Sequence, residues 1–175
     1  LFRSYSHIEA TDRAIGRFLL PAATRNDTVV VFTSVHGDMH GAHGLFRKGW
    51  PHEESVRVPL LVRGRRAEDR GRSDDGNVSL LNLSELMFAE VENRRPKFEN
   101  SGAYISMPSV VALTHQCDRE WRGVRTKTRK LVLGPDGSTW LFFDLVKDPL
   151  ETTNRASDPA YAGEISALRA QHGLR

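Results

Sequence analysis

The chain has 175 residues, of which 39% are hydrophobic and 27% are charged, a composition typical of a globular protein with a sizeable core. Its formal net charge of +3 does not indicate a nucleic-acid partner, because the basic residues are scattered among 22 acidic ones. Cys117 is the only cysteine, which excludes an intrachain disulfide framework and a metal site built from cysteines. No apolar run approaches the ~20 residues of a membrane span and no signal peptide is visible, so the compartment stays open. Because the first residue is Leu1 rather than Met, we expect a segment of a longer protein.

The first half of the chain has the pattern of an α/β layer. The predicted elements are a helix from Tyr5 that ends before Pro21, strands over 28–33 and 58–62, an exposed loop over 63–77, and a core helix over 79–91 capped by Ser79 or Asn82. The run over 28–33 is continuously β-branched and aromatic, which is typical of a strand covered on both faces. A helix followed by such a strand favours parallel strands.

The second half has the pattern of a small antiparallel sheet. The polar stretch 92–108 contains two prolines and predicts a boundary, so we divide the chain into domains 1–92 and 93–175. The elements expected beyond it are strands over 110–114, 121–126, 130–133 and 140–145, and a helix after Asp158. The turn sequence Gly134-Pro-Asp-Gly137 predicts a hairpin between the last two strands.

The chemistry is expected in the long irregular segment between the first two strands. Four of the seven histidines lie there with an acid and a lysine: His36, His40, His43, His52, Asp38 and Lys48. In an α/β sheet, ligands bind beyond the carboxyl ends of strands, which is where a loop following Thr33 emerges. Imidazoles beside a carboxylate suit a divalent cation, and a lysine suits an anionic ester. From the residues alone, a metal or anion site and a hydrogen-bonded structural turn both stay open.

The order of residues in this segment resembles the sulfatase family. Sulfatases carry Ser-Asp-His-Gly-Asp-Met-x-Gly-x-His-Gly, then Lys-Gly, then Tyr-Glu-x-x-x-Arg-Val-Pro. With the same spacing, the chain has Ser34-Val-His-Gly-Asp-Met-His-Gly-Ala-His-Gly44, then Lys48-Gly49, then His52-Glu-Glu-Ser-Val-Arg-Val-Pro59. Further matches are the opening helix with His7, Ile8, Glu9 and Asp12, the run Val78–Leu83, Arg125-Thr with Lys130, and Phe143-Asp-Leu-Val-Lys-Asp-Pro149 with Glu151 and Asn154.

The resemblance implies the C-terminal portion of a fold of the alkaline phosphatase superfamily. The implied fold class is α/β, with a partial alkaline-phosphatase-like parallel or mixed sheet and helices, followed by a small antiparallel sheet and a C-terminal helix. The implied activity is sulfuric ester hydrolysis, in which a formylglycine attacks sulfur and a divalent cation, usually calcium, binds the nucleophile and a sulfate oxygen. By position, the resemblance makes His36 a metal ligand and Lys48 the catalytic, sulfate-binding lysine. It makes His43 a further substrate-binding candidate and Asp38 a residue that shapes the site.

The chain departs from the family pattern in two respects. Val35 stands where the family has a metal-binding aspartate, and its side chain has no lone pair for a cation, so we expect weakened binding. The formylglycine precursor motif, Cys/Ser-x-Pro-x-Arg, does not occur, so we expect the nucleophile in an N-terminal half of the fold and no turnover from this segment alone. The expected substrate is a small-molecule or glycan sulfate ester. The alternatives are a catalytically inactive sulfatase-like protein and a phosphate or phosphonate ester hydrolase of the same superfamily.

Overall fold

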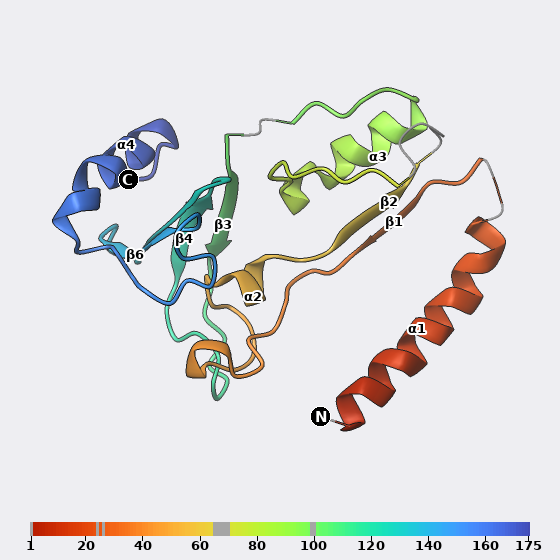
Figure 1. Ribbon diagram of the computed structural model, residues 1–175, viewed down its shortest axis with the longest axis horizontal. Helices are drawn as coiled ribbons and strands as arrows, with labels where there is room; N and C mark the ends of the chain where they lie inside the picture. Colours follow the sequence, from red (N-terminus) through yellow and green to blue (C-terminus); the bar gives the residue numbers. More distant parts are fainter. Residues whose placement is uncertain (1, 24, 26, 65–70, 99–100) are drawn as a thin grey trace. The chain divides into compact units, whose positions relative to one another are not determined.

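The computed structural model describes residues 2–23, 25, 27–64, 71–98 and 101–175, in which alternating helices and strands are followed by four consecutive strands and a last helix (Figure 1). The helices are α1 Phe2–Ala23, α2 Glu53–Val56, α3 Leu83–Val91 and α4 Ala162–Gln171, with short 3-10 turns at Ala42–Gly44, Leu80–Asn82 and Pro159–Tyr161. The strands are β1 Val30–Thr33, β2 Leu60–Arg63, β3 Ala103–Met107, β4 Trp121–Arg125, β5 Arg129–Leu133 and β6 Thr139–Asp144. They form a sheet of β1 and β2 and an antiparallel sheet in the order β3-β4-β5-β6. The predicted mixed α/β class with an antiparallel sheet and a C-terminal helix is therefore confirmed.

The residues group by their internal contacts into two compact units. The first comprises Leu1–Phe32, Leu60–Ser73 and Ser84–Lys97, and the second comprises Thr33–Pro59, Asp74–Leu83 and Phe98–Arg175. The loop that follows β1 thus belongs to the same unit as the C-terminal sheet. The division into domains at residue 92 stays a prediction.

In the first unit, β1 and β2 run antiparallel. The guanidinium of Arg63, at the end of β2, donates to the carbonyl oxygens of Arg25 and Thr28, which precede β1, at 3.0 and 3.2 Å. This pair is therefore not the parallel one that a helix followed by a buried strand favoured.

Helix α1 extends further than its sequence indicated. It continues through Pro21 to Ala23, because a proline in the last turn removes only one backbone donor. In the part of the chain that the structure describes, no helix is both long and apolar enough to cross a membrane.

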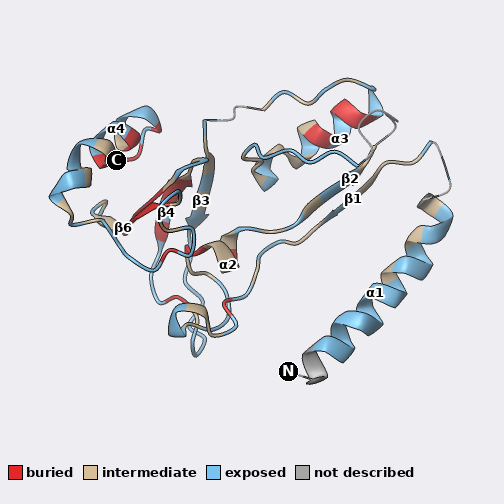
Figure 2. Ribbon diagram, viewed as in Figure 1, coloured by how far each residue is buried: buried red, intermediate tan, exposed pale blue. Residues whose placement is uncertain are grey.

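Apolar side chains of the first unit remain exposed, as the pale blue of α1 in Figure 2 shows. Phe18 is 81% exposed, Leu61 is 61% exposed and Phe88 is 63% exposed. The expectation that the strand over 28–33 is covered on both faces is therefore wrong for the described residues, since Phe32 on β1 is also 39% exposed. The layers that would cover these faces are not supplied within this unit.

In the second unit, the four-stranded sheet is buried on both faces. On one face Leu131, Leu133 and Phe142 pack with Ile165 and Leu168 of α4. On the other face the core residues are Cys117, Trp121, Val132, Leu141 and Phe143, against which Trp50 and Val56 pack. Alternation along β5 and β6 produces both layers, because successive side chains of a strand point to opposite faces. The loop after β1 is thereby seated on this sheet.

The strand predicted over 110–114 is wrong. The first strand of the sheet is β3, within the polar stretch that predicted a boundary, and it pairs from Ala103 opposite Arg125 to Met107 opposite Trp121. The run over 110–114 instead follows Pro108 and forms turns in which Gln116 N donates to Leu113 O. The hairpin at Gly134–Gly137 and the Ser79 cap, which accepts from Leu81 N, are confirmed.

Candidate functional site

The candidate site lies in the loop of residues 34–57 between β1 and β2, called here the site loop. Its first arm, residues 36–41, bonds to its second arm, residues 45–49, through Met39 N to Arg47 O at 2.9 Å and Gly41 N to Leu45 O at 2.9 Å. The site loop bends sharply in both arms and between them, since its residues with positive φ are His40, Gly41, His43, Gly44, Arg47 and Gly49. The four-residue helix α2 closes the loop.

The site loop brings His36 and Lys48 together. Lys48 Nζ lies 3.0 Å from His36 Nε2, and both residues are exposed. His36 Nδ1 lies 2.8 Å from the carbonyl oxygen of Gly37, which can only accept, so Nδ1 carries the proton and Nε2 presents a lone pair. A fixed tautomer of this kind is what a histidine ligand to a cation requires. The structure thus brings two of the predicted site residues together, while their roles stay predictions.

The metal expected from the resemblance does not fit the donors that this loop supplies. Val35 is 86% exposed and contributes no donor atom. Positions 35 and 36, where the family pattern has Asp-His, therefore offer one imidazole nitrogen and no side-chain oxygen. Among the described residues, no three His, Cys, Asp or Glu side chains are arranged to hold a metal ion. His36 alone cannot satisfy a hard dication, which needs several oxygen ligands.

Asp38 has the local role that was expected of it. Its carboxylate accepts from the backbone amide of His40 at 2.9 Å, which stabilises the turn at the positive φ of His40. The His40 side chain is 86% exposed and lies 3.5 Å from the same carboxylate. Both residues shape the first arm.

His43 turns towards α2. Its ring stacks on His52 with centroids 4.3 Å apart, and its Nε2 lies 3.7 Å from Glu54 Oε2. Its side chain is only 19% exposed. These contacts give His43 a packing role in the loop, and its contact with substrate stays a prediction.

His52 is buried, with 9% of its surface exposed, and contacts Phe143 of the sheet. Burial, followed by the proximity of His43 and Lys130, lowers the pKa of His52 to about 4. The unfolded chain, by contrast, binds a proton near the ordinary histidine value of about 6.5. His52 therefore lowers the free energy of unfolding as the pH falls from about 6.5 towards 4, with no further loss below that.

We expect the free energy of unfolding to fall by roughly 2 kcal/mol between pH 7 and 5 through this residue. His52→Tyr, which places the residue common in sulfatases, should remove that part of the pH dependence. Urea titrations at the two pH values measure it, with His7→Tyr on exposed α1 as the matched control. Equal pH dependence in wild type and His52→Tyr would show that His52 is not held neutral.

A buried charge network fastens α2 to the sheet. Lys130 of β5 is fully buried, and its Nζ lies 2.7 Å from Glu53 Oε1, 2.6 Å from Glu151 Oε1 and 3.0 Å from Pro51 O. Arg125 of β4 lies 3.2 Å from Glu53 Oε2, and Glu151 Oε2 accepts from Glu53 N at 2.9 Å. Two cations thus face two carboxylates, and the network has no net charge.

The carboxyl groups of this network differ in their surroundings. Burial alone would raise the pKa of Glu53, but the positive charges of Lys130 and Arg125 outweigh burial and lower it. Burial raises the pKa of Glu151, which is only 1% exposed, and Lys130 offsets part of that rise. The sequence identified Lys130 and Glu151 only as matches to family motifs. The signal for a buried ion pair is the charged Lys130 in the strand 129–133, which is otherwise mostly apolar.

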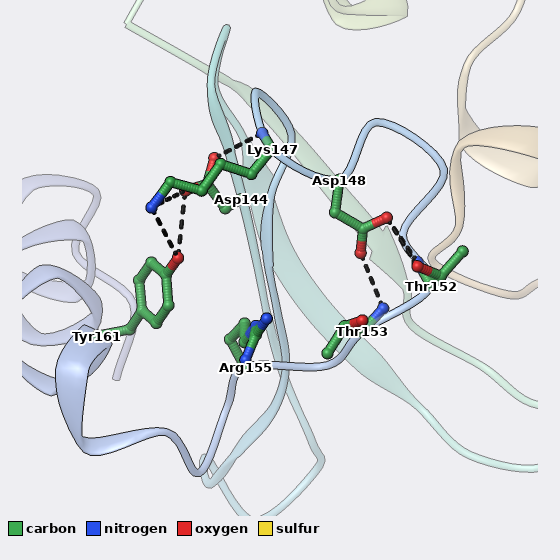
Figure 3. Close-up of a pocket in the computed structure, with 7 residues that line it drawn as sticks. All are labelled: Asp144, Lys147, Asp148, Thr152, Thr153, Arg155 and Tyr161. Atoms are coloured by element: carbon green, nitrogen blue, oxygen red, sulfur yellow. Dashed lines mark hydrogen bonds and ion pairs between the residues drawn. The ribbon is translucent and has the colours of Figure 1, made fainter.

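The C-terminal motif around Asp148 forms a separate polar pocket of about 200 Å³ (Figure 3). Asp148 accepts hydrogen bonds from Thr152 N, Thr152 Oγ1 and Thr153 N, and Asp144 accepts one from the hydroxyl of Tyr161. The carboxylate of Asp148 is therefore satisfied by its own turn, and that of Asp144 by its own turn together with Arg129 and Tyr161. This motif stabilises the segment that carries Glu151.

Comparisons with known proteins agree with the resemblance of the site-loop motifs to those of sulfatases. The sequence profile of the family described as Sulfatase matches residues 3–88. An arylsulfatase of Clostridium perfringens (strain 13 / Type A) is 31% identical over 191 residues, covering 94% of this chain and 37% of the relative. The chain thus spans about a third of the length of this relative.

Solved structures show the same fold. The structure of BT4656 in complex with its substrate D-glucosamine-2-N,6-O-disulfate matches with a TM-score of 0.77 and 26% identity, covering 94% of this chain and 37% of that one. The phosphonate monoester hydrolase of Agrobacterium radiobacter matches with a TM-score of 0.67 and 23% identity, covering 91% and 38%. Together with the ordered motifs of the site loop, these likenesses establish that the chain belongs to the sulfatase family.

Proposed function

We propose that this chain forms part of a sulfuric ester hydrolase and supplies Lys48 and His36 to its active site. The observation that carries the proposal is the exposed pair of Lys48 Nζ and His36 Nε2, 3.0 Å apart, in a loop with the residue spacing of sulfatases. Its exposure leaves the ammonium group able to reach an anionic ligand.

Lys48 acts on the transferring group. An ammonium beside a sulfate ester donates hydrogen bonds to its oxygens and stabilises the charge that builds up as the ester bond breaks. The site loop fixes where the ammonium lies, because Lys48 is followed by Gly49, whose peptide is bonded on both sides to buried residues. In this role Lys48 binds and orients the sulfate group.

His36 presents its Nε2 lone pair on the side of the Lys48 ammonium, with Nε2 3.0 Å from Lys48 Nζ. Because Nδ1 is committed to Gly37 O, His36 can accept a proton or ligate a cation only through Nε2. A divalent cation, which we propose to be calcium by the family resemblance, would neutralise charge on the sulfate group. It needs oxygen ligands from residues beyond those of this loop.

The nucleophile lies outside the sequence. No Cys-x-Pro-x-Arg or Ser-x-Pro-x-Arg occurs in the 175 residues, and the chain spans about a third of the arylsulfatase that it resembles. The apolar side chains of α1, β2 and α3 are exposed, and an N-terminal half of the fold that carries the nucleophile would cover them. That half of the fold is the partner that we propose for this chain.

The proposed substrate class is a sulfate ester of a sugar or other small molecule. The similar structure of BT4656 contains D-glucosamine-2-N,6-O-disulfate. A phosphonate monoester hydrolase of the same fold supports a second candidate, an ester hydrolase acting on phosphonates or phosphates. Val35 supports a third, a relative that has lost its activity.

Val35→Asp tests the proposed site. In a sulfatase-length protein containing this chain, we expect the added carboxylate to raise calcium affinity by on the order of tenfold, because hard cations are held by oxygen ligands and negative charge. Calorimetric titration with calcium measures the affinity. Hydrolysis of an aryl sulfate, compared with the aryl phosphate and a phosphonate monoester, measures the substrate class.

Val35→Asn is the matched control, since it adds an oxygen without the charge. Calcium affinity that rises only with aspartate assigns the effect to charge, and a rise with both variants assigns it to the donor atom. Unchanged affinity in both would refute the role of position 35 as a ligand position. Hydrolysis of the phosphate or phosphonate in preference to the sulfate would refute the sulfatase assignment.

A further inference from the structure

Ser55 contacts both arms of the site loop. Its carbonyl oxygen accepts from Gly37 N at 2.8 Å, next to His36, and its hydroxyl oxygen accepts from Gly49 N at 3.2 Å, next to Lys48. Ser55 is 3% exposed, so it has little contact with solvent. One buried residue thus bonds to the chain neighbours of both site residues.

The peptide of Gly49 is held from the other side as well. Trp121 of β4, which is 4% exposed, donates from Nε1 to Gly49 O at 2.7 Å. Gly49 has φ of +88°, a backbone conformation that disfavours any larger residue. The peptide groups of the residue that follows Lys48 are therefore held at its amide and at its carbonyl.

The first arm approaches α2 closely. A Cβ on Gly37 would lie 1.9 Å from the carbonyl oxygen of Glu54, so only glycine allows the bond between Gly37 N and Ser55 O. Helix α2 itself is fastened to the sheet through Glu53, which bonds to Lys130 and Arg125. Ser55 is therefore a fixed point from which both arms are held.

We propose that Ser55 is a positioning residue that sets Lys48 against His36, and that Trp121 acts with it on the peptide of Gly49. Ser55 touches neither the ammonium nor the imidazole in this arrangement and acts through the backbone of their neighbours. The consequence for catalysis rests on the proposed function. The effect of Ser55 on the distance between Lys48 and His36 does not depend on the proposed function.

The test is the distance between Lys48 and His36 in solution. In a labelled sulfatase-length protein containing this chain, we expect a nuclear Overhauser cross-peak between the Lys48 Hε protons and His36 Hε1. In Ser55→Ala, which removes only the hydroxyl acceptor, this cross-peak should be lost. The dispersed amide signals of β4, β5 and β6 should remain, which a merely destabilised fold would not show.

Two further variants make the test decisive. Trp121→Phe keeps an aromatic ring but removes the donor to Gly49 O, and it should also lose the cross-peak. Ser106→Ala, on the exposed face of β3, is the matched control and should keep it. The proposal is overturned if the wild type lacks the cross-peak, if Ser55→Ala retains it, or if Ser106→Ala loses it, and retention in Trp121→Phe removes Trp121 from it.

Turnover separates this proposal from the proposed function. In a sulfatase-length protein, Ser55→Ala should lower kcat on an aryl sulfate by about tenfold or more with KM little changed, because a displaced Lys48 stabilises the transition state less. Loss of the cross-peak in Ser55→Ala with no sulfate hydrolysis by the wild type would support positioning and refute only the sulfatase assignment. Loss of the cross-peak with kcat unchanged would overturn the catalytic consequence.

Discussion

Replacing Lys48 by alanine is expected to lower kcat/KM for a sulfate ester by on the order of 100-fold to 1000-fold in a sulfatase-length protein containing this chain. The ammonium is the cationic group that the site loop holds beside His36 Nε2, at 3.0 Å. Its loss removes a charge-assisted donor that acts on the transferring group. Because Lys48 is exposed, the free energy of unfolding should change by less than about 0.5 kcal/mol.

Steady-state kinetics on an aryl sulfate and a urea titration measure the two effects of Lys48→Ala. Lys127→Ala is the matched control, because Lys127 is also an exposed lysine but lies in the turn between β4 and β5. Lys48→Arg keeps the positive charge but replaces the compact ammonium with a larger, planar guanidinium group, so it should retain part of the activity. Activity within about twofold of the wild type in Lys48→Ala would remove Lys48 from the mechanism.

The order of the sequence motifs predicted the site better than the composition of the loop did. Four histidines in one segment left both a metal or anion site and a structural turn open, and the structure shows why. His43 and His52 stack on each other over the sheet, and His40 points to solvent, so only His36 presents a nitrogen beside Lys48. Sequence spacing relative to a known family identified the one histidine that composition could not.

The second half of the fold was predicted where local signals were strong. Gly134-Pro-Asp-Gly137 fixed the hairpin of β5 and β6, because a turn sequence acts locally. Strand β3 was missed because its few apolar residues, Tyr104, Ile105 and Met107, lie inside a polar stretch, and its partner β4 follows some distance along the chain. Pairing across such a distance depends on the tertiary fold, which local propensity does not contain.

The buried network around Lys130 could not be predicted for the same reason. Glu53 and Glu151 lie far in the sequence from Arg125 and Lys130, which are paired on β4 and β5, and the four meet only when α2 packs on the sheet. A sequence alone presents them as four separate charges, which are most often exposed. The structure makes them one neutral cluster that carries the loop of the candidate site.

Lys130→Met is expected to lower the free energy of unfolding of the second unit by about 3–5 kcal/mol, because it leaves buried carboxylates without their cation. Lys130 is fully buried and Glu151 is 1% exposed, so water cannot replace the lost ion pair at 2.6 Å. Glu53 would still pair with Arg125 at 3.2 Å, so the carboxylate left without a cation is that of Glu151. Urea titration followed by circular dichroism measures the change.

The double variant Lys130→Met/Glu151→Met distinguishes an unpaired charge from lost packing. Removing both partners leaves Glu53 paired with Arg125, and a buried ion pair replaced by apolar side chains often costs little, so we expect the double variant to be more stable than Lys130→Met alone. Lys127→Met, at an exposed position, should change the free energy of unfolding by less than about 0.5 kcal/mol. If the double variant were the less stable of the two, Glu151 would hold α2 on the sheet, and Ser55 with it, even without Lys130, through the hydrogen bond that it accepts from Glu53 N.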